Sequence, residues 1–121
     1  MTSRLTSDQL EQAVALKQSG KYEEALTILT ELLVENPDWA EVRHQMGLVQ
    51  YFSGLFDESL ATLKHARDLA PESVEIRNDL GLTYATLGMY DEARAEFNEV
   101  LSVDPTNAKA QEQLQYFVDL A

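Results

Sequence analysis

The sequence predicts an all-α fold made of stacked helix pairs, and three observations lead to this prediction. All five glycines and all three prolines of the 121 residues recur at an interval of 34 residues. Between them, apolar residues recur every three or four positions, the spacing that buries one face of a helix. A fixed period of this length is typical of arrays in which each unit packs only on its neighbours.

The second unit shows how each pair is built. Its first helix is expected from Ala40 to about Ser53, with apolar residues at Val42, Met46, Val49 and Phe52. A turn at Gly54–Leu55 follows, and the second helix carries Leu60, Leu63, Ala66 and Leu69. Pro71 then ends the pair, because proline lacks a backbone donor and clashes inside a helix.

The period divides the chain into units of about residues 6–39, 40–73 and 74–107, followed by a seventh helix at about 108–120. No linker or low-complexity stretch interrupts the sequence, so a single domain over 1–121 is expected. The first helices of two units are expected to start at capping boxes, formed by Thr6 with Gln9 and by Asp38 with Glu41.

Each corner between paired helices carries two adjacent carboxylates, in the sequences GKYEEAL (20–26), GLFDESL (54–60) and GMYDEAR (88–94). An acid/base site needs one unique, partly desolvated pair rather than three equivalent ones. Acidic residues in the first turn of a helix are favourable against the helix dipole. We therefore interpret these pairs as helix-start residues.

Gly47 and Gly81 fall inside predicted helices, where glycine is about 1 kcal/mol less favourable than alanine. This cost is explained if a side chain at either position would hold the paired helices apart. We therefore expect close helix packing at both glycines.

The composition excludes several classes of protein. With 21 acidic and 9 basic residues the formal net charge is −12, which disfavours nucleic acid and favours basic partners. The sequence has no apolar run long enough to cross a membrane, and its first residues do not resemble a secretory signal. It also has no cysteine, so disulfides, thiolate metal sites and thiol nucleophiles are excluded. We expect a soluble, cytoplasmic protein without membrane insertion.

The repeated columns resemble the tetratricopeptide repeat (TPR) family. The third unit carries the resemblance best, through Leu80, Gly81, Tyr84, Gly88, Tyr90, Ala93, Phe97 and Pro105. The frequent tryptophan column of the family is absent and holds Gln9, Arg43 and Arg77. The resemblance implies a right-handed α-solenoid of seven helices, in which the first helices line a concave groove and the last helix caps the array. It implies little about the specific pathway, because the repeat serves many.

The resemblance also implies a peptide-binding groove with an apolar stripe bordered by acidic and polar residues. The stripe would contain Val14, Leu48, Tyr51, Phe52, Leu82, Tyr116 and Leu120. The bordering residues would be Glu11, Lys17, Glu41, His44, Gln45, Glu75, Asn78, Asp79 and Thr86. Such a surface suits a helix or extended segment with apolar anchors and Lys or Arg. The alternative is that some of these side chains only pack between adjacent first helices.

One TPR subfamily holds the C-terminal carboxylate of heat-shock chaperones in a clamp rich in lysine and asparagine. The corresponding positions here are Leu10, Val14, Gln45, Glu75 and Asp79. None is Lys or Arg, and the two acidic residues would repel a carboxylate. This chaperone-binding role is therefore not expected.

Two functions remain as hypotheses. The first is a non-enzymatic adaptor that binds a peptide or helix of a partner protein in the groove. The second is a structural protein that forms homodimers or oligomers through its terminal repeats or last helix, where Tyr116, Phe117 and Leu120 are apolar on more than one side. The sequence shows no phosphate loop or nucleophile motif, and neither His44 nor His65 has a partner at metal-ligand spacing. No catalytic residue, metal or cofactor is expected.

Overall fold

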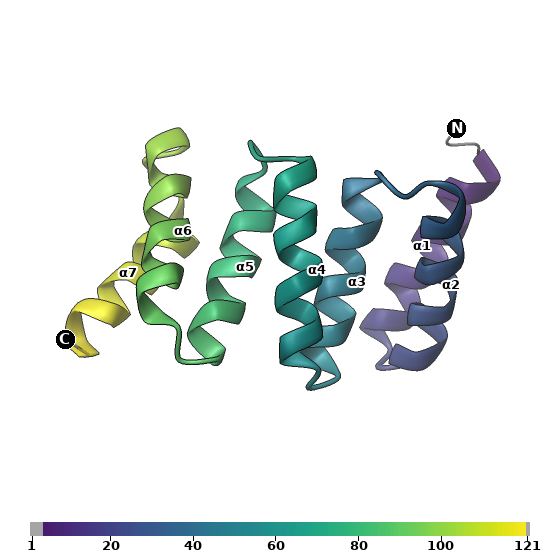
Figure 1. The fold of residues 1–121 in the computed structure, drawn as a ribbon, viewed down its shortest axis with the longest axis horizontal. Coiled ribbons are helices and arrows are strands. Elements are labelled where there is room, and N and C mark those ends of the chain that lie inside the picture. Colours follow the sequence, from purple (N-terminus) through teal and green to yellow (C-terminus); the bar gives the residue numbers. More distant parts are fainter. Residues whose placement is uncertain (1–3, 121) are drawn as a thin grey trace.

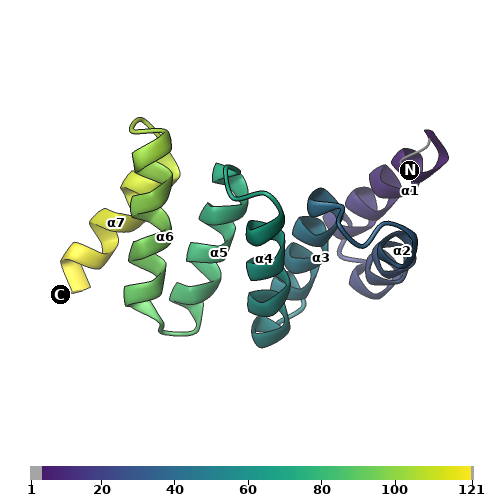
Figure 2. The same cartoon turned by 45° about the horizontal axis from the view of Figure 1, so that its top comes forward.

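The computed structural model describes residues 4–120, with side chains for residues 6–117, and this part of the chain forms seven α-helices and no strand. They are α1 (Arg4–Gln18), α2 (Tyr22–Glu35), α3 (Ala40–Phe52), α4 (Phe56–Leu69), α5 (Val74–Thr86), α6 (Tyr90–Val103) and α7 (Ala108–Leu120). Each helix packs against the next one in the chain, and the helices form a row with α1 and α7 at opposite ends (Figures 1 and 2). The prediction of an all-α solenoid is confirmed.

The three corners between paired helices have one conformation. Gly20, Gly54 and Gly88 have φ angles of +78°, +83° and +77°, in the left-handed region that glycine enters without a steric penalty. In the second corner the N–H of Leu55 donates to the carbonyl of Gln50 at 2.8 Å, and equivalent bonds close the other two corners. A hydrogen bond from an N–H to the carbonyl five residues earlier, next to a glycine with positive φ, is the Schellman motif that commonly ends α-helices. The period of the glycines therefore follows from backbone geometry.

The glycines inside helices mark close contacts between paired helices. A Cβ atom added at Gly47 would lie 2.6 Å from Leu63, and one at Gly81 would lie 2.7 Å from Phe97. Both separations are far below normal carbon contacts. The interpretation that a side chain would separate the paired helices is confirmed.

The two predicted capping boxes are wrong. Helix α1 begins at Arg4, so Thr6 lies inside it, and α3 is preceded by Trp39, which makes no side-chain capping bond. Ser73 does cap α5, because its Oγ accepts from the N–H of Ile76 at 3.2 Å. Asp38 stands one position too early to cap α3 in the same way.

At the position where the family frequently has tryptophan, this chain has polar side chains that form hydrogen bonds to the backbone. Arg43 donates from Nε to the carbonyl of Pro37 at 3.0 Å, and Arg77 donates to the carbonyl of Pro71 at 2.9 Å. Gln111 donates in the same way to the carbonyl of Pro105 at 2.8 Å. The starts of α3, α5 and α7 are thus each bonded to the preceding turn.

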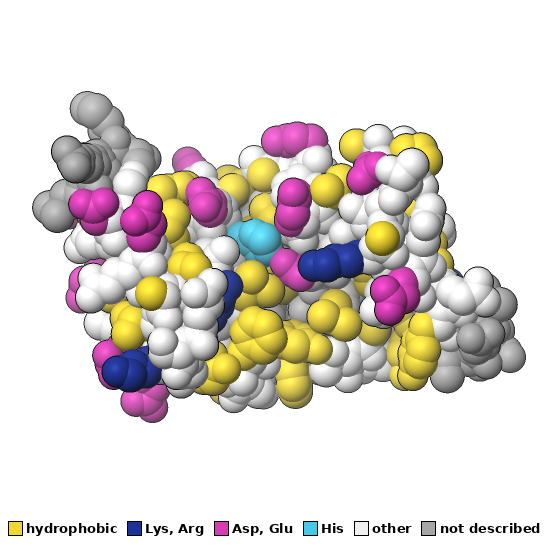
Figure 3. Space-filling model, turned by 180° about the vertical axis from the view of Figure 1, so that it is seen from behind, with side chains coloured by type: hydrophobic (Ala, Val, Ile, Leu, Met, Phe, Trp, Pro, Cys, Tyr) yellow, Lys and Arg dark blue, Asp and Glu magenta, His cyan; other side chains and the backbone are white. Residues whose placement is uncertain are grey.

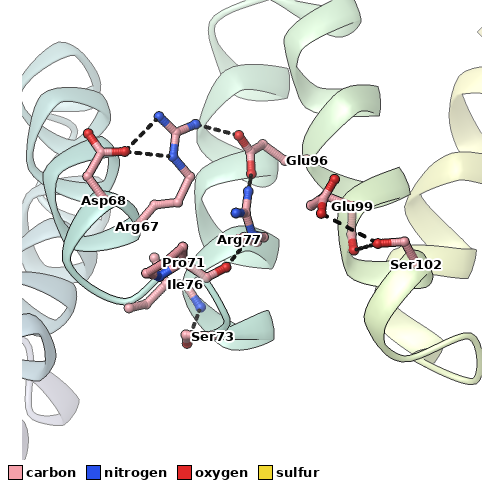
Figure 4. A network of polar contacts seen from close by, with 9 residues as sticks. All are labelled: Arg67, Asp68, Pro71, Ser73, Ile76, Arg77, Glu96, Glu99 and Ser102. Atoms are coloured by element: carbon pink, nitrogen blue, oxygen red, sulfur yellow. Dashed lines mark hydrogen bonds and ion pairs between the residues drawn. The ribbon is translucent and has the colours of Figure 1, made fainter.

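A buried carboxylate connects three helices at the junction between the second and third pairs (Figure 4). Glu96 of α6 accepts from Arg67 of α4 at 2.6 Å and from Arg77 of α5 at 2.9 Å. Its side chain is 8% exposed, and the two guanidinium groups compensate the cost of burying its negative charge. The position one period earlier is Thr62, which has no charge to offer Arg43.

Candidate protein-binding groove

The first helices of the pairs lie side by side on one side of the molecule. Helix α1 contacts α3, and α3 contacts α5. With α7 they form the face seen in Figure 3, whereas α2, α4 and α6 lie toward the viewer in Figure 1. A hollow of about 460 Å³ opens on this face between α3, α5 and α7. We call this face the groove.

The groove has an apolar part on α3, α5 and α7. The exposed fractions of Phe52, Leu82 and Tyr116 are 54%, 37% and 57%. We call these three residues the apolar row. Apolar side chains gather across the lower middle of this face, while Asp and Glu side chains follow its upper edge (Figure 3).

Tyr51 supports the apolar row more than it extends it. Its ring, half-buried, lies edge-on to Phe52 at 5.7 Å and to Phe56 at 5.2 Å. Its hydroxyl lies 2.8 Å from Thr86 Oγ1, which itself donates to the carbonyl of Leu82. Tyr51 is therefore the donor, and this exposed bond connects α3 to α5.

Two polar pairs connect the first helices within the groove. Lys17 Nζ donates to Gln45 Oε1 at 2.6 Å, which joins α1 to α3. His44 Nε2 lies 2.6 Å from Asp79 Oδ2, which joins α3 to α5. Burial lowers the pKa of the Lys17 ammonium, and the negative charge of Asp79 opposes this effect. These four residues meet in two pairs across the groove.

The acidic edge consists of Glu11, Glu41 and Glu75, one on each of the first three odd-numbered helices and all exposed. Lys109 of α7 also lines the hollow, and sequence reasoning missed it. It stands 34 residues after Glu75, so extending the column of Glu41 and Glu75 by one period would have found it.

Family models decide the classification of the chain. One model described as tetratricopeptide repeat matches residues 38–106, which is more than half of the chain, and another matches residues 9–38. This chain belongs to the tetratricopeptide repeat family. No curated protein sequence matches it significantly.

Solved TPR structures share this fold at low sequence identity. The first TPR domain of Spaghetti (RPAP3), bound to the HSP90 peptide SRMEEVD, has a TM-score of 0.91 and 18% identity over 99% of this chain and 95% of that one. The TPR domain of Arabidopsis OM64 has a TM-score of 0.89 and 18% identity over 96% of both chains. YrrB, a TPR protein with an unusual peptide-binding site, has a TM-score of 0.83 and 19% identity over 95% of this chain and 58% of its own.

The TPR structure changes the expected role of several residues. Phe117 is 1% exposed and packs against Tyr90 and Phe97, so its assignment to a self-association surface is wrong. Its face of α7 is turned toward α6, which is why it is buried. Val14 is half-buried against the core cluster that contains Leu10 and Leu29, and Leu48 is also half-buried. The side chain of Leu120 lies outside the described residues.

Asn78 is also more buried than a groove residue was expected to be, at 7% exposed. Its Nδ2 donates to Asn107 Oδ1 at 3.0 Å, and this bond connects α5 to the start of α7.

In the described part of this TPR domain, no helix combines the length and apolar character needed to cross a bilayer.

Proposed function

We propose that this TPR domain is a non-enzymatic adaptor that binds a segment of a partner protein in its groove. The observation that carries the proposal is the apolar row of Phe52, Leu82 and Tyr116, which is exposed on the face whose upper edge is acidic. Exposed apolar side chains grouped on one face commonly mark a binding surface. A segment laid across α3, α5 and α7 would cover all three.

The chemistry of the groove favours a basic, amphipathic segment. Apolar anchors would bury against the apolar row, and Lys or Arg would face Glu41 and Glu75. The net charge of −12 adds long-range attraction for such a segment. With three helix pairs the contact is small, and we expect transient binding with about 1,200 Å² buried in total.

The same chemistry disfavours an acidic C-terminal peptide such as the one bound by the Spaghetti domain. Glu75 and Asp79 stand where a carboxylate clamp needs cations, and His44 is already paired with Asp79. The similarity to that structure supports peptide binding as a mode of action. It does not extend to the charge of the peptide.

A display selection of random 16-residue peptides against the immobilised protein tests the proposal. We expect selected peptides to be enriched in Lys and Arg together with Leu, Phe or Met, and to bind less tightly as salt screens the charges. Selection of predominantly acidic peptides, or binding that does not change with salt, would count against the proposed chemistry.

A further inference from the structure

The hollow between α3, α5 and α7 contains a buried acceptor that lacks a donor. Asn78 Oδ1 is closed to water and accepts no hydrogen bond from any described residue. Leaving such a buried group unpaired is unfavourable, because it has lost its bonds to water without gaining others. Asn78 lines the hollow, so a donor that enters the hollow reaches this covered oxygen only after a neighbouring side chain moves.

The orientation of the Asn78 amide is determined by its neighbours. Its Nδ2 donates to Asn107 Oδ1, which also accepts from the N–H of Ala110 at 3.0 Å. The Nδ2 of Asn107 donates in turn to Asp104 at 3.3 Å. Turning the Asn78 amide around would place two oxygens against each other, so the unpaired atom is the acceptor. The hollow therefore needs a donor and not an acceptor.

Two carboxylates line the same hollow. Glu75 is exposed, and no ion pair or hydrogen bond joins its side chain to another described residue. Asp79 uses only Oδ2 in its contact with His44 Nε2, and its carboxylate keeps further acceptor capacity. Once Asn78 Oδ1 is uncovered, three neighbouring residues of α5 supply acceptors at the hollow. A ligand group that carries positive charge and several donors would satisfy them together.

Two basic side chains also face this hollow. His44 already donates to Asp79, because a carboxylate can only accept. Lys109 is exposed on the α7 side and forms no ion pair with Glu75 or Asp79. Its long side chain can leave the hollow for solvent, so it competes with an entering cation without blocking it.

We infer that this hollow is the subsite for an arginine side chain of the bound segment, an inference that rests on the proposed function. A guanidinium carries five N–H donors in a planar fork, which suits several acceptors at once. A lysine ammonium has three donors around a single point and fits such an arrangement less well. The subsite also places the basic side of the segment next to Leu82, which lines an adjoining hollow with Asn78 and Asp79.

The test is a titration of the ¹⁵N-labelled full chain with Nα-acetyl-arginine methylamide and with its lysine counterpart, at low ionic strength, followed by two-dimensional NMR. We expect saturable shifts of the backbone amides around Glu75 and Lys109 and of the Asn78 side-chain amide. The arginine derivative should bind at least about threefold more tightly than the lysine derivative. Glu75→Gln should weaken the arginine derivative at least about threefold, and Lys109→Gln should strengthen its binding.

Glu58→Gln is the matched control, because Glu58 is exposed on α4, outside the groove, and its substitution makes the same change in net charge. It should leave the titration unchanged. Equal responses to both derivatives, or equal weakening by Glu75→Gln and Glu58→Gln, would overturn the arginine subsite. Peptides selected through the apolar row would then still support the proposed function. Shifts at the hollow without any groove-binding peptide would instead separate the subsite from that function.

Discussion

A Cβ atom placed on Gly81 would lie 2.7 Å from the ring of Phe97, so the glycine of α5 and the aromatic ring of α6 determine how closely this helix pair packs. Gly81 is fully buried inside a helix, and Phe97 is 1% exposed. Phe97 belongs to the core cluster that also contains Leu80 and Phe117. Any group added at position 81 must displace the ring.

Gly81→Ala should therefore destabilise the protein by about 1–3 kcal/mol, the usual cost of forcing extra atoms into a packed core. Helix propensity acts in the opposite direction and would favour alanine by about 1 kcal/mol. Urea unfolding followed by circular dichroism measures the difference. An increase in stability would show that the contact with Phe97 does not limit the packing.

Glu96→Gln should destabilise the protein by about 2–3 kcal/mol, because it leaves Arg67 and Arg77 without their shared carboxylate. Glu99→Gln on the same helix is the control, since Glu99 is exposed. Chemical denaturation of both variants gives the comparison. Equal stability of the two variants would mean that the buried network contributes no net stabilisation.

Phe117→Ala should cost about 3–5 kcal/mol of stability, because the ring is 1% exposed and fills space between Tyr90 and Phe97. Tyr116→Ala, at a 57% exposed neighbour, should cost far less. Thermal unfolding and light scattering are measured together. A Phe117→Ala protein of unchanged stability but altered oligomeric state would return this residue to a self-association surface.

Alkaline pH should destabilise the fold through Tyr84. Burial raises the pKa of its hydroxyl, and nearby Arg67 and Glu96 act on it with opposite signs. The unfolded tyrosine loses its proton near pH 10 while the folded one retains it, so this contribution is complete below pH 10 and is lost as the pH rises through the folded pKa. Tyr84→Phe should show a smaller loss of stability between pH 9 and about 11 in pH-dependent melting curves. An identical loss in both proteins would assign it to other groups.

The helix pairs could be predicted from the sequence because glycine reports backbone geometry directly. Gly54 is needed where φ is positive, and Gly81 is needed where a ring leaves no space, so both recur with the repeat. The exposure of Phe52 and Leu82 also followed from their columns, since the period places them on one face.

The partners of polar side chains could not be predicted in the same way. A column places His44 and Asp79 on one face, but their bond depends on side-chain lengths and helix offsets that the period does not encode. Asp38 matched a capping pattern one residue away from the actual helix start. Phe117 was assigned to the surface because helical periodicity alone does not say which side of the last helix meets α6.

The central claim is that the groove binds the partner segment, and the most direct test is the affinity of one selected peptide measured by isothermal titration calorimetry. The double variant Phe52→Ala with Leu82→Ala removes two members of the apolar row. The control, Val34→Ala with Val103→Ala, truncates two apolar side chains that are 78% and 60% exposed on α2 and α6, outside the groove. We expect the groove variant to lose at least about tenfold in affinity, which corresponds to about 1.4 kcal/mol, and the control to bind like the unmodified protein. Unchanged affinity of the groove variant, or an equal loss in the control, would contradict binding in the groove.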